Sequence, residues 1–62
     1  MDTGDDERLA LLRLGLVPGV GPRVASDLLT RFGSAQAIFR ATGPELLAVD
    51  SVKPKVSAAI TA

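Results

Sequence analysis

The stretch LVPGVGPRVASDLL, residues Leu16–Leu29, holds the pattern that decides the fold. Pro18 cannot continue a helix, because it has no backbone N–H and its ring fixes φ. Gly19 and Gly21 follow, and glycine allows positive φ and close approach of another backbone. Pro22 suits the first position of a new helix, where a missing N–H costs nothing. The stretch therefore predicts two helices joined by a tight turn.

Apolar residues recur at helical spacing on both sides of this turn. Before it, a leucine stripe at i, i+3 and i+7 is widened by two further leucines; the five are Leu9, Leu12, Leu16, Leu11 and Leu14. After it, residues at i, i+3, i+4 and i+7 predict one buried face, made of Ala25, Leu28, Leu29 and Phe32. Gly33 is expected to end that second helix.

Three more short helices are predicted downstream. Ser34 is expected to cap the first, Thr42 and Glu45 have the spacing of a capping box at the second, and Pro54 begins the third. The residues expected on their apolar sides are Ala35, Ile38, Phe39, Leu46, Leu47, Val49, Val56, Ala59 and Ile60. Because no clean period-2 run lies between the turn signals, the chain is predicted to be all-α, with five short helices.

Charge divides the chain into two parts. The 62 residues carry seven acidic and seven basic side chains, and four of the acids lie in residues 1–7. We expect residues 1–7 to be an acidic flexible N-terminus and residues 8–62 to form one folded domain. That domain has seven basic residues against three acids. Its excess of positive charge permits contact with a polyanion without requiring it.

Composition argues against an enzyme. The chain has no cysteine, which removes disulfides and thiolate metal sites, and no histidine, which removes the commonest base and the commonest metal ligand. Asp27, Glu45 and Asp50 are scattered and are interpreted as surface or capping acids. No apolar run approaches the roughly 18 residues of a membrane span, and the acidic start is unlike a secretory signal. We therefore expect a cytoplasmic protein with no catalytic site and no membrane contact.

The turn recurs 32 residues later. With that shift, like residues align; the pairs are Val17 with Val49, Val20 with Val52, Pro22 with Pro54, Arg23 with Lys55, Val24 with Val56, and Leu28 with Ile60. Such a repeat indicates a duplicated structural unit. Gly19 becomes Ser51 and Gly21 becomes Lys53 in the second copy. We therefore expect the first turn to be the better anion site, and Lys53 and Lys55 to add charge only.

The first turn has the chemistry of a phosphate site. The N–H groups of Gly19, Gly21, Arg23 and Val24 can converge on one phosphate, and the helix that begins at Pro22 adds the positive end of its dipole. Arg23 can add a charge-assisted hydrogen bond. Two plainer interpretations stay open: the glycines serve the turn alone, and the basic residues are ordinary solvated charges.

Residues 17–29 resemble the helix-hairpin-helix motif of DNA repair and recombination proteins, and the duplication resembles a tandem helix-hairpin-helix (SAM-like) domain. The leucine run at residues 9–14, the turn at residues 17–23 and the segment RFGSAQA at residues 31–37 resemble the N-terminal region of the DprA family of DNA-processing proteins, which act in natural transformation. The C-terminal domain of the excision nuclease subunit UvrC has a very similar order of motifs.

The resemblance implies non-specific contact with single- or double-stranded DNA through residues 17–24. It also implies a monovalent cation at the backbone carbonyls of Gly15, Val17 and Val20, and no other cofactor. The DprA resemblance further implies that residues 8–62 are the N-terminal domain of a longer protein, with a downstream domain and the recombinase RecA as partners. The competing hypothesis is a protein-interaction or dimerisation module without DNA binding, which the altered second turn and the acidic N-terminus favour.

Overall fold

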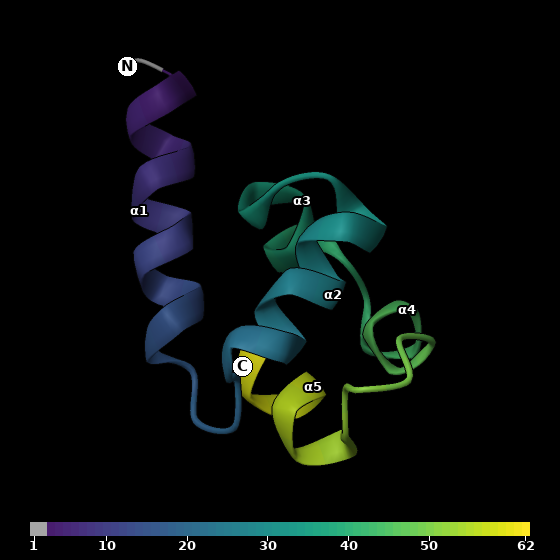
Figure 1. Cartoon of the computed structure of the whole chain (residues 1–62). Helices are drawn as coiled ribbons and strands as arrows, with labels where there is room; N and C mark the ends of the chain where they lie inside the picture. The colour runs from purple at the N-terminus through teal and green to yellow at the C-terminus, as the bar shows by residue number, and fades with distance from the viewer. Residues whose placement is uncertain (1–2) are drawn as a thin grey trace.

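Five helices form the chain in the computed structural model, which describes residues 3–62 (Figure 1). They are α1 (Thr3–Leu16), α2 (Pro22–Phe32), α3 (Ala35–Arg40), α4 (Gly43–Leu47) and α5 (Pro54–Thr61). The described residues contain no strand, so the all-α prediction is confirmed. No helix within this described part is long and apolar enough to cross a membrane.

The predicted helix signals act as local chemistry requires. Pro22 and Pro54 occupy the first positions of α2 and α5. The Ser34 side chain accepts a hydrogen bond from the Ala37 N–H at 3.1 Å, and Thr42 and Glu45 form the full capping box of α4. Gly33 has a φ of +89° and ends α2 by donating its N–H to the Leu29 carbonyl at 2.8 Å.

The core draws one large side chain from each of the first four helices: Leu14, Leu28, Ile38 and Leu46, all fully buried. Val52, Val56 and Ile60 complete it from the second turn and α5. Helices α1 and α2 both pack against α3, and α4 packs against α5. The molecule measures 32 × 21 × 18 Å.

The leucine stripe predicted for the first helix is wrong. Leu9, Leu12 and Leu16 are exposed, with relative accessibilities of 58%, 63% and 82%, whereas Ala10 and Leu14 are buried. This segment has leucines around most of its circumference, so spacing alone does not select the buried face. Leu11 of α1, and Leu47 of α4, which was also expected to face inward, are exposed as well.

A carboxylate fixes the rotation of α1. The Glu7 side chain accepts hydrogen bonds from the N–H groups of Ala35 and Gln36, at 2.7 and 3.1 Å, across the start of α3. These bonds from Ala35, then Gln36, lower the pKa of Glu7 below its usual value of 4.5. We expected residues 1–7 to be flexible; instead α1 begins at Thr3 and Glu7 holds α3, while residues 1–2 lie outside the described part.

Candidate nucleic-acid interface

The first turn, residues 17–21, leads from α1 into α2 at the lower end of the molecule in Figure 1. Val17 and Val20 pack against the core. The Val20 N–H donates to the Val17 carbonyl at 3.1 Å and closes the turn. The turn is therefore anchored by its apolar residues, while Pro18 and Gly19 are exposed.

Gly19 is a glycine because the fold needs one there. Its φ is +90°, in the region that side chains disfavour. A Cβ at this position would lie 2.8 Å from Cγ2 of Val56 in α5. The plainer interpretation of Gly19, that it serves the turn, is therefore supported by the packing of the first turn against the helix of the second.

Gly21 is a glycine without such a need. It is the N-cap of α2, with extended φ and ψ of −93° and −178°, a conformation open to any residue. A Cβ built there would meet no atom within 4 Å. The cap also has no side-chain hydrogen bond. The effect of having glycine at this position is therefore that the backbone at the start of α2 is exposed.

The amides around Gly21 have no protein acceptors. Within the described residues, none of the N–H groups of Gly19, Gly21, Arg23 and Val24 donates to a backbone or side-chain oxygen. Helix starts normally leave such groups to side chains, water or ligands. The start of the 11-residue α2 adds the positive end of its dipole. This set of donors can hold an anionic oxygen.

The second turn repeats the first in part. The Val52 N–H donates to Val49 O at 2.9 Å, and Lys53, at the N-cap of α5, has extended φ and ψ of −97° and 161°. However, Ser51 does not adopt the positive φ of its counterpart Gly19, since no non-glycine residue in the described part has positive φ. The Val56 N–H donates to Lys53 O at 2.9 Å. The Val56 N–H, which corresponds to the Val24 N–H of the first turn, therefore already has an acceptor within the protein.

An acidic side chain joins the two turns. Asp27 lies 3.7 Å from the Arg23 guanidinium, and it accepts a hydrogen bond from the Ser51 hydroxyl at 2.8 Å. The sequence indicated only a surface acid at this position, because its partner is 24 residues away. The Arg23 side chain remains 87% exposed. Its cation is thus available to a ligand beside the amides of α2.

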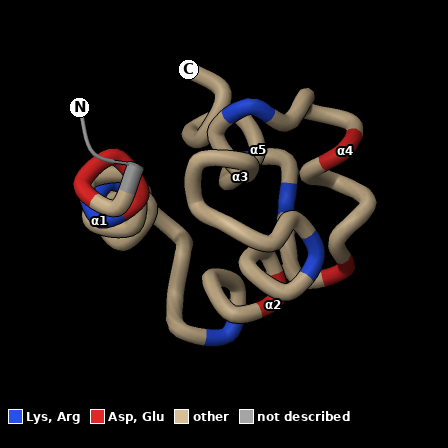
Figure 2. Tube along the Cα trace, turned by 90° about the horizontal axis from the view of Figure 1, so that it is seen from above, with Lys and Arg blue, Asp and Glu red and all other residues tan. Residues whose placement is uncertain are grey.

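The other basic residues do not gather on one face. Lys53 and Lys55 are exposed at the start of α5. Figure 2 shows basic and acidic positions interspersed around the chain trace, with acids at the N-terminal end of α1 and on α2 and α4. Glu45 is a capping acid as expected, and the bond from the Thr42 N–H lowers its pKa. Any polyanion contact therefore depends on a local site.

Backbone groups are the remaining candidates for a metal. No cluster of three or more acidic, histidine or cysteine side chains that could hold a metal occurs among the described residues. The carbonyls of Gly15, Val17 and Val20 lie in the last turn of α1 and in the turn that follows. Val17 O already accepts the Val20 N–H, and a carbonyl oxygen has a second lone pair. The monovalent cation stays a prediction.

Residues 9–62 match the model of a protein family described as the helix-hairpin-helix motif. The chain belongs to this helix-hairpin-helix family. The matched residues include both turns and all of α2 to α5, so the assignment agrees with the duplicated turns seen in the structure. The prediction of a helix-hairpin-helix fold is confirmed.

Curated relatives are parts of larger proteins. UvrABC system protein C of Acinetobacter baylyi is 38% identical over 55 residues, 89% of this chain and 9% of that protein. The same protein of Moorella thermoacetica is 48% identical over 46 residues, 74% of this chain and 8% of its own length. A DNA ligase of Natronomonas pharaonis is 41% identical over 44 residues, 71% of this chain and 6% of the ligase. No solved structure matches at comparable significance.

These relatives favour the UvrC resemblance over the DprA one. The chain spans less than a tenth of each relative just described. A specific relation to the DprA family is not shown. The helix-hairpin-helix is a DNA-binding, non-catalytic motif, which agrees with the prediction that this chain is not an enzyme.

Proposed function

We propose that this chain provides a weak, sequence-independent contact with the DNA phosphate backbone through residues 17–24. The observation that carries the proposal is Gly21, a glycine that neither backbone conformation nor packing requires. It lies beside the unpartnered amides of Arg23 and Val24. A side chain there would stand between those amides and an approaching phosphate, whereas glycine lets the backbone come close.

The contact we propose carries no base information, because phosphate contacts position a protein on DNA without reading its sequence. One turn neutralises few phosphates, so affinity is low and falls only slowly with salt. A monovalent cation at the carbonyls of Gly15, Val17 and Val20 would hold the turn in shape. The resemblance to related hairpins supports this cation, which would bind without any acidic side chain.

The setting we propose is a UvrC-type DNA repair protein, in which this domain places a larger enzyme on its DNA. The similarity to the two UvrABC system protein C sequences supports it. A DprA-type DNA-processing protein is the second setting, supported by the leucine run of residues 9–14 and the Phe-Gly-Ser segment at residues 32–34. In that second setting, RecA and a downstream domain would be the partners.

The experiment compares two charge reversals of equal size. Arg23→Glu places an acid beside the free amides, whereas Arg31→Glu changes an exposed residue in the last turn of α2. Mobility shifts on a short duplex at low salt should weaken about tenfold for Arg23→Glu and much less for Arg31→Glu. Equal losses would show that only net charge matters and would remove the case for a site at the turn.

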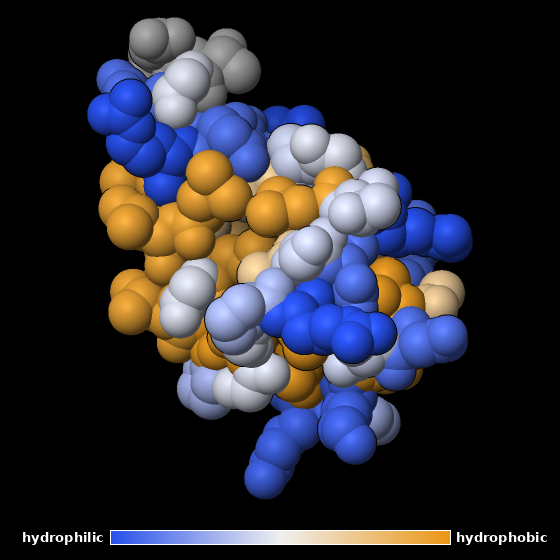
Figure 3. All heavy atoms as spheres, viewed as in Figure 1, coloured by the Kyte–Doolittle hydropathy of each residue, from blue (hydrophilic) through white to orange (hydrophobic). Residues whose placement is uncertain are grey.

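A protein-interaction surface is the second candidate function, because α1 presents an apolar face. Leu9, Leu12 and Leu16 lie on one side of this helix and are more than half exposed. Figure 3 shows hydrophobic residues covering the outer side of α1. Exposed patches of this kind mark contacts with other proteins. Leu12→Ser should then abolish any concentration-dependent association seen by sedimentation, and association that persists in the variant would exclude this face.

A further inference from the structure

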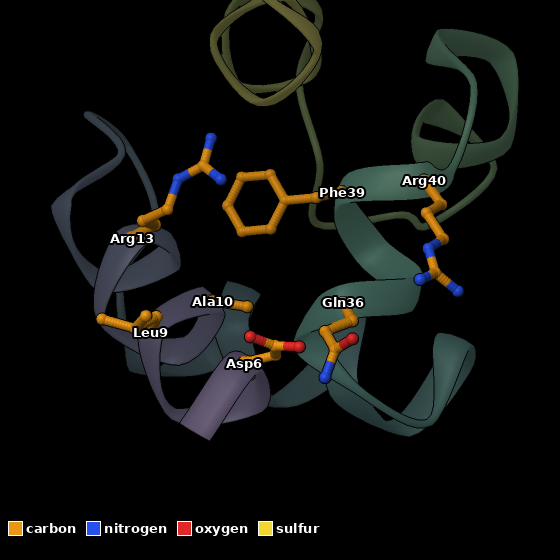
Figure 4. A pocket seen from close by; sticks show the side chains of 7 residues that line it. All are labelled: Asp6, Leu9, Ala10, Arg13, Gln36, Phe39 and Arg40. Atoms are coloured by element: carbon orange, nitrogen blue, oxygen red, sulfur yellow. The ribbon is translucent and has the colours of Figure 1, made fainter. Parts of the chain in front are cut away.

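An open groove outside the 17–24 turn runs along the contact between α1 and α3 and has a volume of about 430 Å³ (Figure 4). Its α1 side is formed by residues at i, i+3, i+4 and i+7, namely Asp6, Leu9, Ala10 and Arg13. Its size falls within the roughly 300–1,000 Å³ of small-ligand sites. The hairpin mechanism uses none of these side chains.

The groove is lined by side chains of different chemistry. Figure 4 shows the Asp6 carboxylate near Ala10 and Gln36, the Phe39 ring beside the Arg13 guanidinium, and Arg40 on the other side of Phe39 from Arg13. From α3, Phe39 contributes an aromatic ring and Arg40 a guanidinium group. A carboxylate, an aromatic surface and two cations therefore line a single groove.

Two charged groups of the groove, Asp6 and Arg40, are available to a ligand. Asp6 is half-buried, and Arg40 is exposed; neither makes a hydrogen bond or ion pair with the described residues. The Arg13 guanidinium lies 4.7 Å from the centre of the Phe39 ring. Such a stack presents one flat cationic surface, on which a second planar group can lie.

We propose that this groove binds one unpaired nucleotide of single-stranded DNA, with preference for a base that carries an exocyclic amino group. The groove offers a partner for each part of a nucleotide. The base stacks on the Phe39 and Arg13 surface, its amino group donates a hydrogen bond to the Asp6 carboxylate, and its phosphate meets Arg40. This inference rests on the proposed contact between DNA and residues 17–24.

The groove selects an unpaired base. In a duplex the base is stacked on both sides and its amino group is paired, so it cannot reach the apolar middle of the groove. Asp6 discriminates further, since cytosine offers an amino donor where thymine offers a carbonyl oxygen. Arg13 lies in the last turn of α1, just before the turn of residues 17–21. One strand leaving a duplex can therefore run from one site toward the other.

The test is an NMR titration of the 62-residue chain with three DNAs: oligo-dC, oligo-dT and a blunt duplex. We expect oligo-dC to shift the amides of Ala10, Gln36 and Phe39 at roughly tenfold lower concentration than oligo-dT, as one base-specific hydrogen-bonded contact can provide. The duplex should shift the amides of Gly21 and Val24 and leave the groove unchanged.

Two variants with matched controls separate the parts of the proposal. Asp6→Asn should remove the preference for oligo-dC over oligo-dT, whereas Asp5→Asn, an equal change on the exposed side of α1, should keep it. Arg40→Glu should weaken oligo-dC binding at the groove about tenfold, and Arg31→Glu should weaken it far less. Far-UV circular dichroism confirms that each variant is folded.

The outcomes distinguish this inference from the proposed function. Shifts at Gly21 and Val24 with every DNA, and none at the groove, would overturn the inference and leave the hairpin contact standing. Groove shifts with oligo-dC and silence at the turn would support the inference and refute the hairpin contact. Equal binding of oligo-dC and oligo-dT, or loss of both with Asp5→Asn, would contradict the assigned role of Asp6.

Discussion

Replacing each of the two glycines of the first turn by alanine should give opposite results. Gly19→Ala forces a side chain into a φ of +90°, which costs of order 1–3 kcal/mol. The new Cβ would also stand 2.8 Å from Cγ2 of Val56, and such overpacking typically costs about 1–3 kcal/mol. Together these effects should destabilise the fold by about 2–6 kcal/mol.

Gly21→Ala should leave the fold almost unchanged. The extended backbone accepts alanine, and the Cβ enters open space. Alanine is a poorer N-cap than glycine, but it also lowers the entropy of the unfolded chain, and the two effects offset each other to within about 1 kcal/mol. A chain of this length has a total stability of roughly 3–9 kcal/mol. Gly19→Ala should therefore lower Tm by roughly 10–30 °C, and Gly21→Ala by a few degrees at most.

For DNA binding, Gly21→Ala should have the larger direct effect at the phosphate site. A methyl group at Gly21 stands in front of amides that donate to no protein acceptor. Losing one hydrogen bond to a charged phosphate costs about 1.5–3 kcal/mol, a roughly tenfold to hundredfold rise in Kd. Gly21→Asp sharpens the contrast: aspartate is a good N-cap and suits the helix dipole, so stability should rise by a few tenths of a kcal/mol while phosphate binding is lost.

Thermal unfolding by circular dichroism and fluorescence anisotropy with a labelled duplex measure the two effects on the same samples. The reasoning is refuted if Gly21→Ala binds DNA as the native chain does, because close backbone approach would then not be needed. It is equally refuted if Gly21→Ala melts as low as Gly19→Ala. A Gly21→Asp variant that keeps its affinity would exclude the start of α2 as the phosphate site.

Three further predictions follow from named contacts. Glu7→Gln should lower Tm at neutral pH, because it removes a carboxylate whose pKa is lowered in the folded state. The stabilisation by Glu7 is present above about pH 4.5 and is lost as the pH falls through the pKa of the folded state. The melting curves of the variant and the native chain should therefore converge in acid. Asp27→Asn keeps an acceptor for the Ser51 hydroxyl but removes the charge beside Arg23, and it should tighten DNA binding about twofold to fivefold in anisotropy titrations with little change in Tm. Lys53→Gly should not create a second phosphate site, and anisotropy should show unchanged or weaker affinity, because the amide that would be needed there already has an acceptor.

The sequence predicted the helices well because their limits are set by local chemistry. Pro22 and Pro54 start helices and Gly33 ends one with positive φ, each for reasons that involve only a few neighbouring residues. The rotation of α1 was not predictable in the same way. It depends on Glu7, whose partners lie 28 and 29 residues away, and a helix with leucines on several sides gives no periodic signal to decide it.

The candidate site was predictable only as a set of residues. The spacing of the two glycines marked the turn, yet it could not separate their roles, since Gly19 is required by a contact with α5 and Gly21 by none in the protein. The bond that ties Asp27 to Ser51 also gave no local signal. The α1–α3 groove was missed because half of it comes from the helix whose orientation was wrong.

The two turns differ in backbone conformation and hydrogen bonding as well as in their two glycine positions. At the second turn Ser51 does not have a positive φ, and the Val56 N–H donates a hydrogen bond to Lys53 O at 2.9 Å. Its counterpart, the Val24 N–H, has no acceptor in the described part of the chain. The same Val56 fills the space that Gly19 leaves open. The second turn has thus become part of the support for the first: its helix packs under the glycine with positive φ and keeps the free amides of α2 at the surface.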